Sequence, residues 1–116
     1  MPILSFKVIN LKEKIVFREI AKFKINKGQE EEFATAALSC RPLFESARGC
    51  RSFSIERCVE TSCIFYLLVE WETVEDHTVH FRQSPAFAEW RERVGKYFAE
   101  PPSVIHTRLS PDNWSA

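Results

Sequence analysis

The sequence has no excess of charge of either sign and no long hydrophobic run. Its 116 residues include 16 Lys and Arg and 16 Asp and Glu, so the formal net charge is zero. Because nucleic-acid binding depends on neutralising phosphates, this balance provides no general attraction to nucleic acid. No apolar run reaches the length that crosses a bilayer. We therefore expect neither a nucleic-acid partner nor a membrane partner.

The chain also lacks the marks of secretion and of metal binding. Residues 1–15 contain neither a basic leader nor a small-residue cleavage site, so we expect a cytoplasmic protein. The four cysteines form no CxxC pair and complete no zinc pattern with histidines, so we expect no metal. Cys58 and Cys63 flank a predicted hairpin loop and could face each other, but a reducing cytoplasm favours free thiols.

Enough apolar sequence is present for one packed domain. Hydrophobic residues make up 45% of the chain, and ten of them are phenylalanines, so disorder is not expected. There is no repeat and no linker rich in Gly, Pro or Ser. We assign residues 16–110 to the domain, residues 1–15 to an arm or extra edge strand, and residues 111–116 to a tail.

Hydrophobic periodicity predicts four strands. Branched and aromatic residues alternate with charged or polar ones at residues 15–25 and 51–59, which indicates half-exposed strands. Residues 63–72 are almost continuously apolar, which indicates a strand covered on both faces. Residues 103–109 form a short final strand. The second and third strands are close enough along the chain to form an antiparallel hairpin.

Helices are predicted after the first and third strands. One apolar helix face follows from spacings of four and three, and it comprises Phe33, Ala37, Cys40, Phe44 and Ala47. Pro42 should kink this helix or restart it. A second helix should open at Thr73 with Asp76 as its capping partner. A third should begin at Ser84 and Pro85, because Ser caps well and Pro suits the first helical position.

The resulting order, βαββαβ, is that of a ferredoxin-like α+β fold. Such a fold carries its helices on one face of a four-stranded antiparallel sheet and leaves the other face bare. A bare apolar face of this kind is usually an interface. We predict a homodimer with the sheets packed face to face, and the predicted interface residues are Ile64, Tyr66 and Leu68.

At this level the chain resembles the antibiotic biosynthesis monooxygenase (ABM) domain family of dimeric α/β barrels. The resemblance lies in the segments KINKGQEEEF, ARGCRSFSIER and FYLLVEWETVEDHTVHFRQSPAF, in that order. The matching positions are Gly28, Glu31, Phe33, Gly49, Ser52, Phe53, Trp71, Glu72, Glu75, His80, Ser84, Pro85 and Phe87. Together they extend over residues 17–109, so the resemblance implies the fold of most of the chain.

The resemblance implies a choice among several activities, since this fold carries many. Its haem-degrading branch uses Asn, Trp and His at positions that hold Ala21, His80 and Trp90 here, which disfavours haem degradation. The cofactor-independent oxygenase branch fits better. It needs a base that ionises a phenol-type substrate and an apolar pocket that accepts oxygen.

On this interpretation His80 is the candidate base, because imidazole titrates near neutral pH. Trp71 would form a pocket wall and donate a hydrogen bond, and Phe44, Phe87 and Trp90 would line the remainder. We thus predict a monooxygenase that needs no cofactor and acts on a small aromatic or quinol-like compound. A dimer that binds a small apolar ligand without turnover, and a small-molecule isomerase, are the alternatives.

The other two histidines are weaker candidates. His77 is more simply a solvated helix residue, and His106 could lie at the pocket or at the interface. Asp76, His77 and His80 would make an incomplete metal site, since HxxH without a third nearby ligand is a weak signal.

Overall fold

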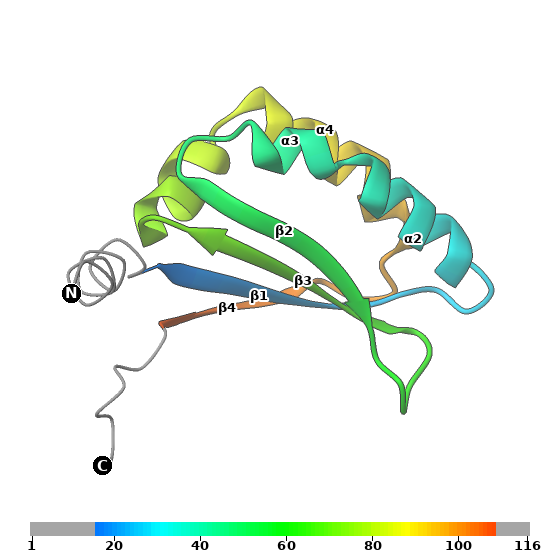
Figure 1. Cartoon of the computed structure of the whole chain (residues 1–116). Helices are drawn as coiled ribbons and strands as arrows, with labels where there is room; N and C mark the ends of the chain where they lie inside the picture. Colours follow the sequence, from blue (N-terminus) through cyan, green and yellow to red (C-terminus); the bar gives the residue numbers. More distant parts are fainter. Residues whose placement is uncertain (1–15, 109–116) are drawn as a thin grey trace, which may run out of the picture.

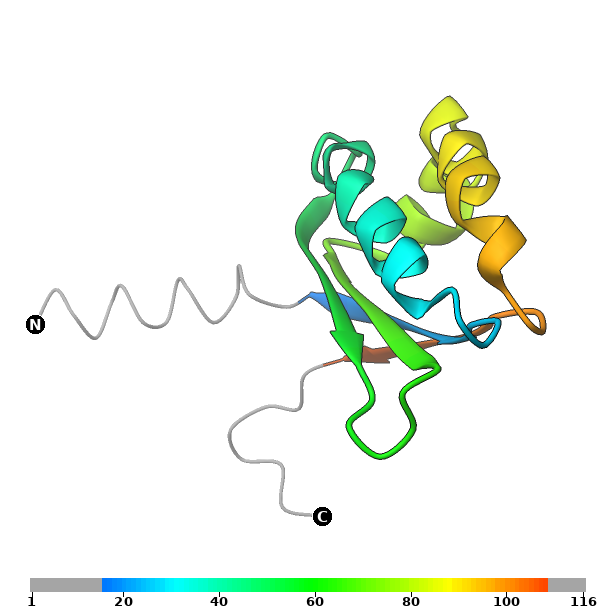
Figure 2. The same cartoon turned by 90° about the vertical axis from the view of Figure 1, so that its right-hand side faces the viewer.

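The computed structural model describes residues 16–108, in which helices cover one face of a four-stranded antiparallel sheet (Figures 1 and 2). Its strands are β1 (Phe17–Lys24), β2 (Cys50–Arg57), β3 (Ile64–Trp71) and β4 (Ser103–Arg108), in the spatial order β2-β3-β1-β4. The predicted ferredoxin-like α+β fold is confirmed. The expected arm at residues 1–15 and tail at 111–116 lie outside the described residues.

The central position of β1 places its side chains between two neighbouring strands. Glu19 pairs with Val69 of β3 on one side and with His106 of β4 on the other. Because side chains alternate between the two faces of a strand, Glu19 points to the same face as Ala21 and Phe23, toward the helices. A carboxyl group is thus inserted into the apolar, helix-covered side of the sheet.

The first helical segment divides where the sequence predicts. Helix α2 (Glu30–Ser39) ends just before α3 (Arg41–Glu45), which has Pro42 in its first turn. Proline lacks the N–H that a continuous helix would need there, so the chain restarts instead of kinking. Phe33, Ala37 and Phe44 are buried against the sheet, as their spacing predicts.

The second helical region contains a wide turn that α-helical periodicity does not predict. A helix opens after Thr73, whose hydroxyl accepts a hydrogen bond from the Asp76 N–H at 3.0 Å. It continues as the π-helix η1 (Asp76–Phe81), in which the Arg82 N–H donates to the His77 carbonyl at 3.1 Å. Such turns are rare and are frequent at functional sites.

Helix α4 (Pro85–Val94) starts as predicted. The Ser84 hydroxyl accepts a hydrogen bond from the Phe87 N–H, and Pro85 occupies the first helical position. After Val94 the chain tightens into the 3₁₀ turn η2 (Gly95–Tyr97) before it leads to β4. Helix α4 and this turn therefore cover the β1 and β4 side of the sheet, beside α2 and α3 (Figure 2).

The two faces of β3 differ as predicted. Phe65, Leu67, Val69 and Trp71 are buried beneath the helices, whereas Ile64, Tyr66 and Leu68 are half-buried on the opposite face. No helix of the described residues covers that opposite face (Figure 1). The homodimer stays a prediction. Cys58 and Cys63 are free thiols, as are the other two cysteines.

Candidate functional site

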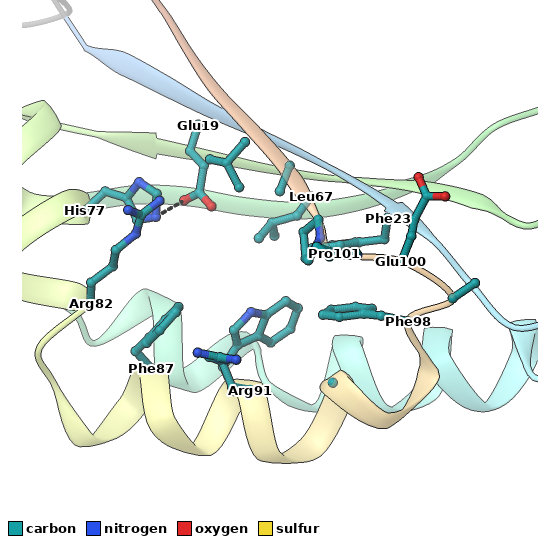
Figure 3. A pocket seen from close by; sticks show the side chains of 16 residues that line it. Glu19, Phe23, Leu67, His77, Arg82, Phe87, Arg91, Phe98, Glu100 and Pro101 are labelled. Atoms are coloured by element: carbon teal, nitrogen blue, oxygen red, sulfur yellow. Dashed lines mark ion pairs between the residues drawn. The ribbon is translucent and has the colours of Figure 1, made fainter.

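A cavity of about 780 Å³ lies between the sheet and α4 (Figure 3). Its sheet wall consists of Glu19, Ala21, Phe23, Leu67 and Val104, and Pro101 and Pro102 lie along its edge. Its helix wall contains Phe87, Trp90 and Phe98. This volume is in the range of small-molecule sites, which are typically apolar with a few polar groups. The cavity is therefore suited to a small ring-shaped compound.

The polar end of the cavity is built around the buried residue Glu19, which is 4% exposed. The Trp71 indole N–H donates a hydrogen bond to Glu19 Oε1 at 3.0 Å. Burial raises the pKa of Glu19 to about 7, although the Trp71 hydrogen bond and the Arg82 charge act in the opposite direction. Near neutral pH this carboxyl therefore exchanges between its protonated and ionised forms.

His77 stands beside Glu19, with its Nε2 3.4 Å from Glu19 Oε1. The ring is 3% exposed and stacks on the Trp71 indole, with ring centres 5.5 Å apart. Burial above all, with the charges of Arg82 and His106, lowers the pKa of His77 to about 3. His77 is therefore neutral at neutral pH, and its contact with Glu19, dashed in Figure 3, joins polar atoms without forming an ion pair there.

The other nitrogen of His77 contacts the half-buried His106. His77 Nδ1 lies 2.8 Å from His106 Nε2, so one of the two nitrogens must carry the hydrogen. A hydrogen on His77 Nδ1 leaves its Nε2 free to accept a proton from the Glu19 carboxyl. A hydrogen on Nε2 instead faces an ionised Glu19, and His106 is then the donor. Glu19, His77 and His106 thus form a row of three side chains, in which protonation of Glu19 is coupled to the tautomers of the two imidazoles.

This row is not arranged as a metal site. His77 stands between Glu19 and His106 and uses one ring nitrogen toward each, so the three side chains do not converge on one point. Within residues 16–108, no group of three or more His, Cys, Asp or Glu side chains could hold a metal ion. The arrangement is suited to moving a proton between neighbouring groups.

Comparison with known proteins identifies the fold family. The family model "Antibiotic biosynthesis monooxygenase" (ABM) matches residues 16–93, more than half of the chain. The chain belongs to the ABM family. The predicted resemblance is confirmed.

Two relatives show how well this ABM chain matches along its length. The uncharacterised protein YczJ of Bacillus subtilis (strain 168) is 37% identical over 89 residues, which cover 77% of this chain and 94% of YczJ. A Bordetella bronchiseptica structure named "putative antibiotic biosynthesis monooxygenase" is 42% identical with a TM-score of 0.82, and the match covers 84% of this chain and 100% of that one.

A more distant structure shares the ABM fold alone. A conserved protein from Methanosarcina mazei Go1 is 18% identical with a TM-score of 0.74 over 87% of this chain and 99% of that one. No helix within residues 16–108 has the length and apolar character to cross a membrane.

The structure places only some of the predicted site residues at the cavity. Phe87 and Trp90 both line the cavity. Phe44 is buried behind Trp90, with the two ring centres 5.0 Å apart, so it supports the wall without forming it. Trp71 is fully buried and contacts Glu19. His80 is exposed and does not line the cavity.

The turn geometry of η1 explains why His77 faces inward while His80 does not. A π-helix has more residues per turn than an α-helix, so residues three apart point in more different directions. Asp76 and His77 are buried by this turn, and His80 is left in solvent. His80 thus lies outside the cavity, and its role as the base stays a prediction.

Sequence reasoning missed Glu19, although a signal was present. Phe17, Glu19, Ala21 and Phe23 alternate along one strand, so the acid shares a face with apolar residues that the core should bury. Burying a charged group without a partner is costly, so an acid in this position indicates a functional or protonated carboxyl.

Proposed function

We propose that this ABM protein is a cofactor-independent monooxygenase that oxidises a small phenol or quinol-like compound in the cavity. The supporting observation is the Glu19 carboxyl, which lies on the wall of an aromatic-lined cavity with a pKa of about 7. A general base is most effective when its pKa lies near the working pH. Glu19 meets this condition, and it can contact a bound ring directly.

The proposed reaction needs no external reductant. For a phenol with a free para carbon, the overall change is phenol plus oxygen to quinone plus water. Glu19 takes the phenol proton, and the phenolate transfers an electron to oxygen. The resulting radicals combine to form a carbon–oxygen bond, and the Glu19 proton completes the hydroperoxide. Loss of the carbon-bound hydrogen and cleavage of the oxygen–oxygen bond then release water, so the substrate supplies all the electrons.

The neighbouring side chains hold and tune this base. Trp71 fixes one oxygen of Glu19 by its indole hydrogen bond, and the neutral His77 ring stands within 3.4 Å of that same oxygen. The positive charge of Arg82 opposes the rise in the Glu19 pKa, and it would also stabilise a phenolate formed beside it. His106 provides a half-buried proton acceptor beyond His77. We assign the base to Glu19 and a positioning role to His77.

Oxygen uptake with a panel of naphthols and hydroquinones tests this proposal. Glu19→Gln should lower kcat about 10²- to 10⁴-fold, because it removes the base without changing the side-chain shape. For the wild type, kcat/KM should rise with pH through about 7 as Glu19 ionises. The matched variant His80→Gln should keep its activity, because His80 lies outside the cavity.

The outcomes separate the hypotheses. Equal oxygen uptake by wild type and Glu19→Gln would overturn the role of Glu19, and loss of uptake in His80→Gln alone would restore the role predicted for His80. Substrate conversion without oxygen uptake would instead identify an isomerase. Binding without any conversion would identify a small-ligand-binding protein.

We also propose that the uncovered sheet face forms a homodimer. Ile64, Tyr66 and Leu68 are half-buried there in the single chain, and a second sheet would remove their remaining apolar surface from water. Sedimentation equilibrium at micromolar concentration should give twice the chain mass. A single-chain mass at that concentration would contradict the dimer.

A further inference from the structure

We propose that the substrate is an aromatic acid, a phenol whose oxygen lies beside Glu19 and Arg82 and whose carboxylate is held by Arg91. The phenol part of this inference rests on the proposed function, whereas the negative charge of the substrate is inferred from the two guanidinium groups. Arg82 follows the π-helix η1 and Arg91 belongs to α4, yet both line the same cavity. Two separate elements thus bring positive charge to one apolar space.

These two arginines differ from most others in the described chain. Six arginines elsewhere in residues 16–108 each lie within ion-pair distance of a carboxylate, namely Arg18, Arg41, Arg48, Arg51, Arg57 and Arg93. No carboxylate of the described residues lies within that distance of Arg82 or Arg91. Arg82 and Arg91 thus place at the cavity two guanidinium groups to which a ligand can supply a carboxylate.

The charge of Arg82 acts at the inner end of the cavity. It lowers the pKa of Glu19 against the larger effect of burial, and it adds to burial in lowering the pKa of both His77 and His106. Figure 3 shows the Arg82 side chain reaching toward Glu19 and His77. An anionic oxygen placed next to Glu19 would thus also lie in the field of Arg82.

Arg91 lies on the helix wall beside an aromatic ring. Its guanidinium carbon is 6.0 Å from the centre of the Phe87 ring, and Figure 3 shows the two side chains next to each other across the cavity from Glu19. A planar guanidinium binds a carboxylate through two parallel hydrogen bonds. A ring between the sheet and α4 could therefore direct its phenol oxygen toward Glu19 and its carboxylate toward Arg91.

The charges of such a complex balance within the cavity. Once Glu19 has accepted the phenol proton it is neutral, and the substrate carries two negative charges opposite the two arginines. Glu100 also lines the cavity and is exposed, so it would oppose the binding of a more highly charged anion. This balance favours a carboxylate over a phosphate monoester.

Isothermal titration calorimetry in oxygen-free buffer at pH 7 tests the inference with two matched probes, 3-hydroxybenzoate and its uncharged isostere 3-hydroxybenzamide. The wild type should bind the benzoate at least about 10-fold more tightly, since hydrogen bonds to charged groups are about twice as strong as neutral ones. Arg91→Gln should remove most of that preference and leave benzamide affinity unchanged, whereas Arg82→Gln, which alters the phenol end of the cavity, should keep most of it. Unchanged benzamide affinity also shows that the variant is folded.

Two further variants sharpen the test. Arg93→Gln, also on α4 but paired with Glu89, should keep the preference for the benzoate. Glu100→Gln should tighten benzoate binding a few-fold, because it removes a repulsive charge. Equal affinity for the two probes, or a preference that survives in the Arg82→Gln/Arg91→Gln double variant, would overturn the inference. Because binding is measured without oxygen, failure of the monooxygenase proposal would leave this result unaffected.

Discussion

Replacing Glu19 with glutamine is expected to stabilise the folded chain above neutral pH while it removes the proposed base. The amide keeps the shape of the carboxyl, and its oxygen can still accept the Trp71 indole hydrogen bond, which measures 3.0 Å. The same oxygen lies 3.4 Å from His77 Nε2 and can accept a hydrogen bond from that nitrogen in the tautomer that carries its hydrogen there. Only the buried negative charge is lost, and burying that charge is costly.

The magnitude follows from the two pKa values of Glu19. The ordinary value is 4.5, and burial raises it to about 7 in the folded chain. Between these values the folded chain holds a proton that the unfolded chain has released, so the free energy of unfolding falls as pH rises. This contribution to stability is complete below pH 4.5 and is lost as the pH rises through about 7, which amounts to roughly 3 kcal/mol.

Glutamine does not titrate, so the variant escapes this loss. Glu19→Gln and wild type should have similar free energies of unfolding at pH 5, and at pH 8 the variant should be more stable by roughly 3 kcal/mol. His77, whose pKa is lowered to about 3, gives stability that is present above 6.5 and is lost as the pH falls toward 3. Because both chains keep His77, its contribution cancels from the comparison.

Urea unfolding at pH 5, 6.5 and 8 measures the difference, with Glu92→Gln as the control on an exposed position of α4. The control should run parallel to the wild type at all three pH values. Parallel curves for Glu19→Gln, or a variant that is less stable than wild type at pH 8, would show that the Glu19 carboxyl is not held in a costly buried position. The proposed base would then lose its physical basis.

Four other substitutions test the fold that holds the site. Gly49→Ala should destabilise the chain by at least about 2 kcal/mol in urea unfolding, because φ is +79° and a Cβ would overlap the buried Asp76 carboxylate. Gly28→Ala is the matched control: its φ is +91° but the space around it is open, so it should destabilise the chain by only about 1 kcal/mol. Leu68→Glu should shift sedimentation from dimer to single chain, because it places a charge in the middle of the proposed sheet interface, and an unchanged dimer would exclude that face. Ser84→Ala should lower the stability by about 1 kcal/mol, because it removes the hydroxyl that caps α4, and an unaltered unfolding midpoint would contradict this.

Sequence patterns predicted the elements that depend on neighbours along the chain. The restart of the helix at Pro42 and the start of α4 at Ser84 follow from the covalent chemistry of single residues. The two faces of β3 follow from strict alternation along one strand. Local signals of this kind need no knowledge of the remainder of the fold, and they were sufficient for the four strands and for α2, α3 and α4, but not for the π-helix η1.

The choice between His77 and His80 depends on contacts that are distant along the chain. The wide turn of η1 buries Asp76, whose carboxylate occupies the space left by the missing side chain of Gly49 and lies 3.5 Å from Arg48 Nε. A loop about 27 residues earlier in the sequence thus accommodates the turn that points His77 inward. Helical periodicity in a local window contains no such information, and the sequence favours His80 over His77 because His80 matches the ABM motif.

The burial of Glu19 affects both the stability of the fold and the chemistry of the site. Its burial among Ala21, Phe23 and Leu67 reduces the stability of the chain at neutral pH, and the same burial raises its pKa into the range of a useful base. A bound aromatic ring would displace water from the cavity and increase the effect of burial, so the carboxyl would hold a proton more strongly with substrate present than without it. Glu19 would therefore be a stronger base with substrate bound than without it. In the protein without substrate, the buried charge would destabilise the fold less than in the complex. This coupling requires the carboxyl to face the cavity, which is the position that Glu19 occupies and His80 does not.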